Sequence, residues 1–158
     1  MYKPEKLIAF VLDDQRYALY LQAVERVIRA VAITSLPEVP ENILGLINIH
    51  GRIVPVYNAR KRFALPEKNS TVNDRIILAH TKSRSVALVA DKVLGVIEPA
   101  EGQQTQFDEI TPGMELFAGV IKLDDGMLLI HDLDRFLSPV EEKSLSQAID
   151  KTKEFQHG

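Results

Sequence analysis

Apolar residues recur along the chain in short runs of about six, and polar, glycine or proline residues close most of these runs. The run at 7–12 ends at Asp13-Asp14, and a second run follows at 16–21, which predicts two strands joined by a tight turn. Runs of this length suit strands better than helices. Further strands are predicted at 24–30, 43–49, 53–57, 75–81, 85–90, 92–98, 116–123 and 127–130.

Helical signals are few and short. A single turn is predicted at 21–23, and Asn58 can cap a short helix at 59–63 with its three basic residues facing outward. Pro139 at a first-turn position opens a carboxy-terminal helix that reaches about Asp150, after which the chain should fray. Many short strands with frequent turns, and no βαβ unit, predict an all-β barrel or sandwich.

Glycine and proline mark places where the strands are interrupted. Pro55 cannot donate a ladder hydrogen bond, so it indicates an edge position or a bulge. Gly45 indicates either a close backbone approach that a side chain would block or a positive φ, and Gly51 serves a turn. The Asp-Gly pair at 125–126 predicts a hairpin turn, whereas Pro99–Pro112 is polar and irregular.

Composition narrows the class of protein. A chain of 158 residues with 46% hydrophobic and 26% charged residues fits one ordinary globular domain. The net charge of −3, with both signs scattered, offers no basic face for nucleic acid. No apolar run approaches the roughly 18–20 residues that span a bilayer, and no signal peptide is visible. We therefore expect a cytoplasmic protein without direct membrane insertion.

Motifs of catalysis and ligand binding are missing from the sequence. There is no glycine-rich phosphate loop, no cysteine, and no ligand-like spacing among the four histidines. The acidic pair Asp13-Asp14 fits a solvated turn, and the apolar continuation of 124–126 does not fit a calcium loop. His131, Asp132 and Ser138 lack a device that would expose a nucleophile. We expect no catalytic residue, no cofactor and no metal.

Two segments share the order strand, glycine turn, strand, short helix: 36–63 and 116–137. Taken in order with the stretch 86–93, they resemble the CheW family of chemotaxis coupling proteins. Residues 45–51 (GLINIHG) look like the family's Gly-Val-x-Asn-Leu-Arg-Gly, and Gly119 to Asp132 looks like its closing hairpin. The resemblance covers about Lys6 to Leu137.

The resemblance implies two small five-stranded β-barrels of SH3 or OB type, joined side by side within residues 1–138. Residues 139–158 would add a carboxy-terminal helix and a frayed tail. It also implies a non-enzymatic adaptor that couples chemoreceptors to a CheA-type histidine kinase. Such adaptors bind the kinase's regulatory domain by barrel-to-barrel packing, and they bind the cytoplasmic hairpin tip of a receptor.

Positions matched to these partner contacts are Val24, Gly45, Gly51 and Gly119, with the apolar neighbours Val27, Ile49 and Val54. The apolar neighbours can equally be ordinary barrel core. Two further positions depart from the family pattern. Arg26 replaces an acidic residue, and His50 replaces an arginine. If these residues face a partner, the charges of that partner should differ too.

Two other functions stay open. The chain could be a CheW-like binding module of another kinase pathway, in motility or development, with different partners. It could also be a small enzyme on a barrel scaffold, because a fold does not determine function. An enzyme would require a pocket with convergent polar groups, for which the sequence offers no candidate set.

Overall fold

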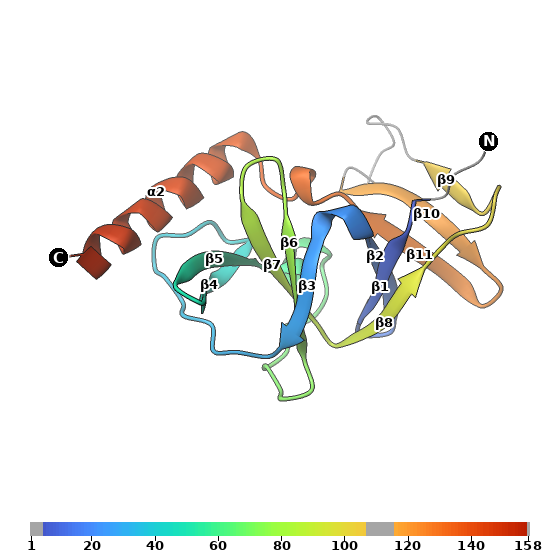
Figure 1. Ribbon diagram of the computed structural model, residues 1–158, viewed down its shortest axis with the longest axis horizontal. Helices are drawn as coiled ribbons and strands as arrows, with labels where there is room; N and C mark the ends of the chain where they lie inside the picture. The colour runs from blue at the N-terminus through green and yellow to red at the C-terminus, as the bar shows by residue number, and fades with distance from the viewer. Residues whose placement is uncertain (1–4, 107–115, 158) are drawn as a thin grey trace.

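The computed structural model describes residues 5–106 and 116–157, and within them the chain is mostly β-strand (Figure 1). The strands are β1 (Leu7–Leu12), β2 (Gln15–Tyr20), β3 (Val24–Arg29), β4 (Ile43–Ile49), β5 (Arg52–Tyr57), β6 (Arg75–His80), β7 (Ser85–Ala90), β8 (Lys92–Ile97), β9 (Gln104–Gln106), β10 (Phe117–Leu123) and β11 (Gly126–His131). The helices are η1 (Leu21–Ala23), α1 (Ala59–Arg62), η2 (Leu133–Arg135) and α2 (Pro139–His157). Each predicted strand is confirmed to within one residue at either end.

The strands form two sheets, which correspond to the two predicted subdomains. The first sheet has the order β8-β1-β2-β11-β10-β9 and the second the order β3-β6-β7-β5-β4, and we call them the first and the second lobe. The amino-terminal hairpin β1–β2 thus belongs with the last strands. The all-β prediction with two subdomains is confirmed. However, the first lobe has six strands instead of five, and neither sheet closes into a barrel along the described residues.

The sixth strand, β9, was not predicted. It lies in the glutamine-rich part of the segment Pro99–Pro112, where no apolar run signals a strand. Backbone pairing with β10 creates it, through the pairs Gly119↔Gln106 and Ile121↔Gln104. The remainder of that polar segment, from residue 107 onward, lies outside the described residues.

Pro55 lies in the inner strand β5, at a position where β5 pairs with β4 but not with β7. The missing backbone N–H of proline therefore costs few hydrogen bonds between strands. Strand β5 pairs with β7 only at Val56 and Tyr57, whereas Pro55 faces Leu46 of β4. Next to it, β4 contains a register shift between Ile43 and Gly45. The predicted edge or bulge therefore describes the local surroundings of Pro55, although β5 as a whole is not an edge strand.

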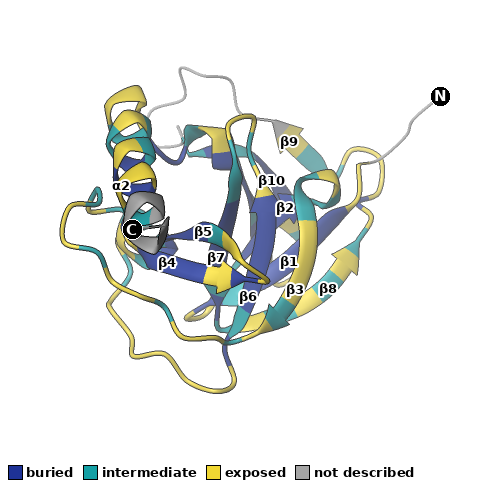
Figure 2. Ribbon diagram, turned by 60° about the vertical axis from the view of Figure 1, so that its left-hand side comes forward, coloured by how far each residue is buried: buried dark blue, intermediate teal, exposed yellow. Residues whose placement is uncertain are grey.

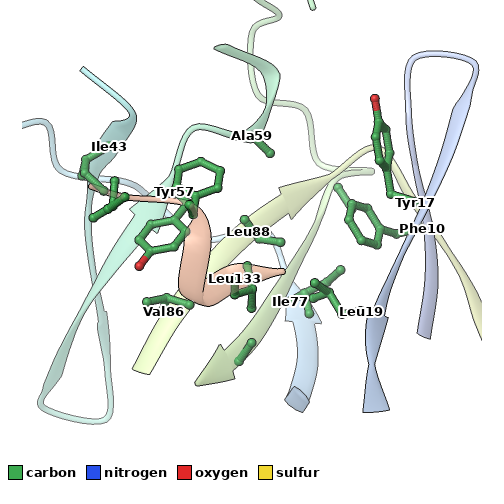
Figure 3. Close-up of a cluster of buried hydrophobic side chains, with 14 of the residues drawn as sticks. Phe10, Tyr17, Leu19, Ile43, Tyr57, Ala59, Ile77, Val86, Leu88 and Leu133 are labelled. Carbon is green, nitrogen blue, oxygen red and sulfur yellow. The ribbon is translucent and has the colours of Figure 1, made fainter. Parts of the chain in front are cut away.

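Most strands are buried on both faces, and this produces three hydrophobic clusters. Ile76 and Leu78 of β6 point into a cluster belonging to the second lobe, whereas Ile77 and Ala79 point into the largest cluster. That largest cluster, which we call the shared core, also receives residues of the first lobe such as Phe10 (Figure 3). The first lobe has its own third cluster on the other face of β1 and β2. Figure 2 shows the resulting buried centre between the sheets.

Helix α2 packs against the shared core and is longer than predicted. Ser138 and Glu141 form a capping box: the backbone N–H of each donates to the side chain of the other, at 3.1 Å. Leu145 and Ile149 are buried in the shared core. The helix continues to His157 rather than ending near Asp150, because no glycine or proline interrupts it before the end of the chain.

One titratable side chain is buried among the aromatic rings of the shared core. His131 is 2% exposed, and its ring centroid lies 4.9 Å from that of Phe63 and 5.5 Å from that of Phe136. Neither ring nitrogen has a hydrogen-bond partner among the described residues. Burial, with a smaller contribution from the positive charge of Arg62, lowers the pKa of His131 to about 3. His131 is therefore neutral in the folded protein.

This burial predicts a loss of stability in mild acid. Below its ordinary pKa of 6.5, His131 takes up a proton in the unfolded chain, but in the folded chain it stays neutral until about pH 3. Stability should therefore fall with pH across this window, by up to about 1.4 kcal/mol per pH unit. Denaturant titrations from pH 7 to pH 4.5 should show a shallower decline for His131→Leu than for the wild type. Parallel declines would contradict the burial of a neutral imidazole.

Candidate partner-binding surfaces

The β4–β5 turn projects two of the predicted partner-binding residues into solvent. His50 and Gly51 form a two-residue hairpin loop between Ile49 and Arg52, and both have positive φ angles, 52° and 86°. Such angles at both central residues define the type I′ turn, which suits the twist of paired strands. The Asn48 side-chain oxygen accepts a 2.7 Å hydrogen bond from the Gly51 N–H. The turn therefore holds the exposed His50 side chain on a well-defined backbone.

A bulge in β3 brings this strand into contact with the β4–β5 turn. Val24 pairs with Ala79 and Arg26 with Leu78, so that Glu25 is the extra residue. Its carboxylate accepts hydrogen bonds from Arg52 at 2.9 Å and from the Ser85 hydroxyl at 3.0 Å. The bond from Arg52 is the main reason that the pKa of Glu25 is lowered. The beginnings of β3, β5 and β7 thus meet at one end of the second lobe.

Three predicted residues on β3 differ in what they can do. Arg26 is exposed, and Val27 is 36% exposed, so both can touch a partner. Val24 is only half-buried, but its side chain packs against the shared core. Replacing Val24 by a charged residue would therefore disturb the core as well as any interface. The neighbouring Val27 is the better position for testing a surface.

Three other predicted site residues are buried in the structure. Ile49 and Val54 are buried in the cluster of the second lobe, so their side chains cannot touch a partner in this conformation. Gly119 is buried in β10 of the first lobe, where it pairs with Ile130 and Gln106. It is not brought together with the β4–β5 turn. In the isolated chain these three positions pack within the fold, and their predicted partner contacts stay predictions.

Sequence reasoning missed the exposed apolar residues of β8. Leu94 and Val96 are 46% and 56% exposed, and they alternate with half-buried residues along the strand. Figures 1 and 2 show β3 and β8 on the same side of the molecule. Each of these strands ends its sheet in the described part of the chain, which leaves a backbone edge unpaired. We call Val27, Leu94 and Val96 the β3–β8 face.

The edge at β4, in contrast, is covered, and Gly45 makes this possible. The backbone of Thr34 exchanges two 2.8 Å hydrogen bonds with Leu46. A Cβ atom added to Gly45 would lie 2.8 Å from the carbonyl carbon of Thr34. The predicted close backbone approach at Gly45 is therefore confirmed, and it lets Thr34 pair with Leu46 in the middle of this edge.

Gly45→Ala should consequently destabilise the protein more than Gly51→Ala. The first substitution forces Thr34 away from β4, at a cost of about 1–3 kcal/mol typical of overpacking. The second meets nothing within 4 Å and carries only the strain of a positive φ, about 1 kcal/mol. Urea denaturation of both variants measures the difference. An equal or smaller loss for Gly45→Ala would show that the Thr34 segment moves away freely.

A cluster of charges joins the two lobes, contrary to the predicted outward-facing Arg60, whereas Asp13 is exposed as predicted. The Arg60 guanidinium donates to Asp13 at 2.7 Å and to Asp91 at 2.5 Å. Lys68 reaches Asp91 at 3.2 Å and Asp74 at 3.3 Å. Burial alone would raise the pKa of Asp91, but the hydrogen bonds from Arg60, the Asp13 backbone N–H and Lys68 lower it.

The same charges line a cavity of about 560 Å³ beside α1. Its polar groups include Arg60, Lys68, Asp74 and Asp91, and all four are engaged in the ion pairs just described. Among the described residues, no group of three or more histidine, aspartate or glutamate side chains could hold a metal ion. The cavity therefore gives no specific support to the enzyme alternative.

Arg60→Ala should weaken the junction between the lobes. Asp13 and Asp91 would lose a largely buried cation, so we expect a loss of about 2 kcal/mol, below the 3–5 kcal/mol of a fully buried pair. The adjacent Lys61→Ala is the matched control, since it removes an exposed pair with Glu41 worth less than about 1 kcal/mol. Denaturation midpoints that fall equally for both variants would contradict a structural role of Arg60.

The fold defines the class of the protein: a two-lobed β-sheet module with exposed apolar residues on its edge strands. The CheW-like domain family model matches residues 6–141, and the chain belongs to this family. No helix in the described ranges is long and apolar enough to cross a membrane.

Comparison with known proteins agrees with this assignment. The chain is 28% identical to the chemotaxis protein CheW of Thermotoga maritima over 89% of this chain and 93% of that protein. It is 30% identical to the chemotaxis protein CheW of Rhizobium meliloti over 87% and 90%. The crystal structure of the scaffolding protein TtCheW from Thermoanaerobacter tengcongensis aligns with a TM-score of 0.78 and 31% identity, covering 88% of this chain and 96% of that one. These relatives indicate an adaptor of the chemotaxis type.

Proposed function

We propose that the chain is a cytoplasmic adaptor that couples chemoreceptors to a CheA-type histidine kinase. The main observation behind this proposal is that the protein exposes two different surfaces, the β4–β5 turn and the β3–β8 face. A coupling protein needs two such surfaces, one for each partner. The turn offers His50 and Gly51 on a rigid hairpin, and the face offers Val27, Leu94 and Val96 on unpaired edges. Membership of the CheW-like family supports the same function.

Each surface suits one kind of partner. A helical receptor tip needs apolar positions into which its apolar face can be laid, and the β3–β8 face supplies them. The β4–β5 turn would then serve the regulatory domain of the kinase, through packing of one β-domain against another. The two partners could bind together because they use different surfaces.

The mechanism is one of affinity rather than chemistry. By holding both partners at once, the adaptor raises the effective concentration of the receptor near the kinase. A receptor movement can then shift the kinase between active and inactive states, provided that the two states bind the adaptor with different affinities. No group on the adaptor has to change covalently.

Titration calorimetry with the kinase regulatory domain and a receptor hairpin fragment, both from the same organism, tests the proposal. Val27→Asp should weaken receptor binding at least about tenfold, or 1.4 kcal/mol, and leave kinase binding unchanged. His50→Asp should weaken kinase binding and leave receptor binding unchanged. Aspartate tolerates the positive φ of this position, so the turn should keep its shape. Both substituted side chains are exposed, so the variants should fold.

Loss of both affinities in each variant would contradict separate surfaces. Binding of neither partner by the wild-type protein would contradict kinase coupling altogether. Val24 is unsuited to this test, because a charge there would perturb the shared core.

A further inference from the structure

The carboxy-terminal part of the chain holds the turn between β6 and β7, which contains Lys82 and Arg84. Arg84 donates a 2.6 Å hydrogen bond to the Ser146 hydroxyl of α2, and it forms a 3.0 Å ion pair with Glu142, one helical turn earlier. The Lys82 backbone N–H donates a 2.8 Å hydrogen bond to the Asp134 carboxylate of η2. Two consecutive elements, η2 and α2, thus fix the β6–β7 turn.

The far side of the β6–β7 turn holds the β4–β5 turn. Ser85, which directly follows Arg84, donates a 3.0 Å hydrogen bond from its hydroxyl to Glu25. Glu25 also accepts a 2.9 Å hydrogen bond from Arg52, the residue that directly follows the loop His50–Gly51. An unbroken series of polar contacts and neighbouring residues therefore leads from α2 to the β4–β5 turn.

The β6–β7 turn is the bridge because a cleft lies between α2 and the start of β5. This cleft, of about 310 Å³, is lined by Arg52 and by Ser146 and Ile149 of α2. Within residues 5–106 and 116–152, Arg52 forms its ion pair with Glu25 and not with α2. Figure 2 shows α2 beside β4 and β5. The helix therefore acts on the β4–β5 turn through the β6–β7 turn rather than by direct contact.

The ion pair at Arg84 is not needed to cover the core. Leu145 and Ile149 of α2 already lie in the shared core. The side chains of Arg84 and Glu142 are 17% and 26% exposed, so both charges lose much of their water when they pair. Such a pair adds little net stability compared with apolar side chains of similar volume. What it adds is a fixed position of the β6–β7 turn relative to α2.

We propose that α2 positions the β4–β5 turn, and that Arg84 transmits the position of the helix. Docked α2 holds Arg84, and the adjoining Ser85 holds Glu25. Glu25 in turn holds Arg52 at the base of the β4–β5 turn, so the turn keeps one conformation while this link is intact. The consequence for binding rests on the proposed function: a turn freed by loss of the link binds the kinase domain more weakly, because binding must then order it.

Amide hydrogen exchange in the full-length protein, followed by NMR at the Gly51 N–H, tests the positioning. This amide donates to the Asn48 side chain and therefore reports the order of the turn. Arg84→Ala should speed its exchange about tenfold, the effect of one lost charge-assisted hydrogen bond on a local opening equilibrium. Ser85→Ala should do the same with α2 still docked, because it breaks only the bond to Glu25. Amides of β10 in the first lobe should keep their exchange rates.

Lys151→Ala is the matched control on the same helix. It removes a 3.0 Å ion pair between α2 and Glu38, which does not lead to the β4–β5 turn, so exchange at Gly51 should stay unchanged. Titration calorimetry with the kinase regulatory domain then measures the consequence for binding. Arg84→Ala and Ser85→Ala should bind about three- to tenfold more weakly, the cost of ordering one or two side chains. Lys151→Ala should bind like the wild type.

Unchanged exchange at Gly51 in either Arg84→Ala or Ser85→Ala would overturn the proposal, and so would equal acceleration in Lys151→Ala. Acceleration that extends equally to β10 would show a general loss of stability instead of positioning. If Arg84→Ala does not fold, Glu142→Gln breaks the ion pair from the side of the helix and takes its place. A wild-type protein that does not bind the kinase domain would contradict the proposed function, whereas the exchange rates, measured on the protein alone, still decide the positioning by α2.

Discussion

The burial of strands on both faces is the constraint on which the rest of this structure depends. Residues of β6 alternate between the cluster of the second lobe and the shared core, as Ile76 and Ile77 do. The first lobe contributes Phe10 and Leu12 to the same shared core. Neither lobe can therefore bury its apolar residues alone, and the two must fold against each other. The charges around Arg60 lie at this junction and fix the lobes to one another.

A sheet buried on both faces leaves only its edges and turns for partners. The β4 edge is bridged at Leu46 by Thr34, which the missing side chain of Gly45 allows to approach. The edges at β3 and β8 stay open among the described strands, and they carry the exposed Val27, Leu94 and Val96. The surfaces proposed for partners are thus the parts of the sheets that the shared core does not use.

The same constraint decides what could be predicted from the sequence. Strands buried on both faces appear as unbroken apolar runs, so that β1 or β6 could be located to within a residue. An unbroken run does not tell which of its residues face outward, and this is why Leu94 was missed and Ile49 was assigned to a partner. Strand β9 has no apolar residue and depends on its pairing with β10. The inward direction of Arg60 depends on Asp13 and Asp91, which are distant in sequence.

The bulge at Glu25 explains in structural terms the two departures from the CheW pattern, Arg26 and His50. The pattern has an acid at the position of Arg26 and an arginine at that of His50. Here the acid lies one residue earlier and the arginine two residues later, and Glu25 and Arg52 pair with each other at 2.9 Å. An opposite-charge pair thus holds the end of the lobe, while the exposed charge on β3 is positive. If this place faces a partner, the partner meets an arginine here instead of an acid, and its own charges should differ accordingly.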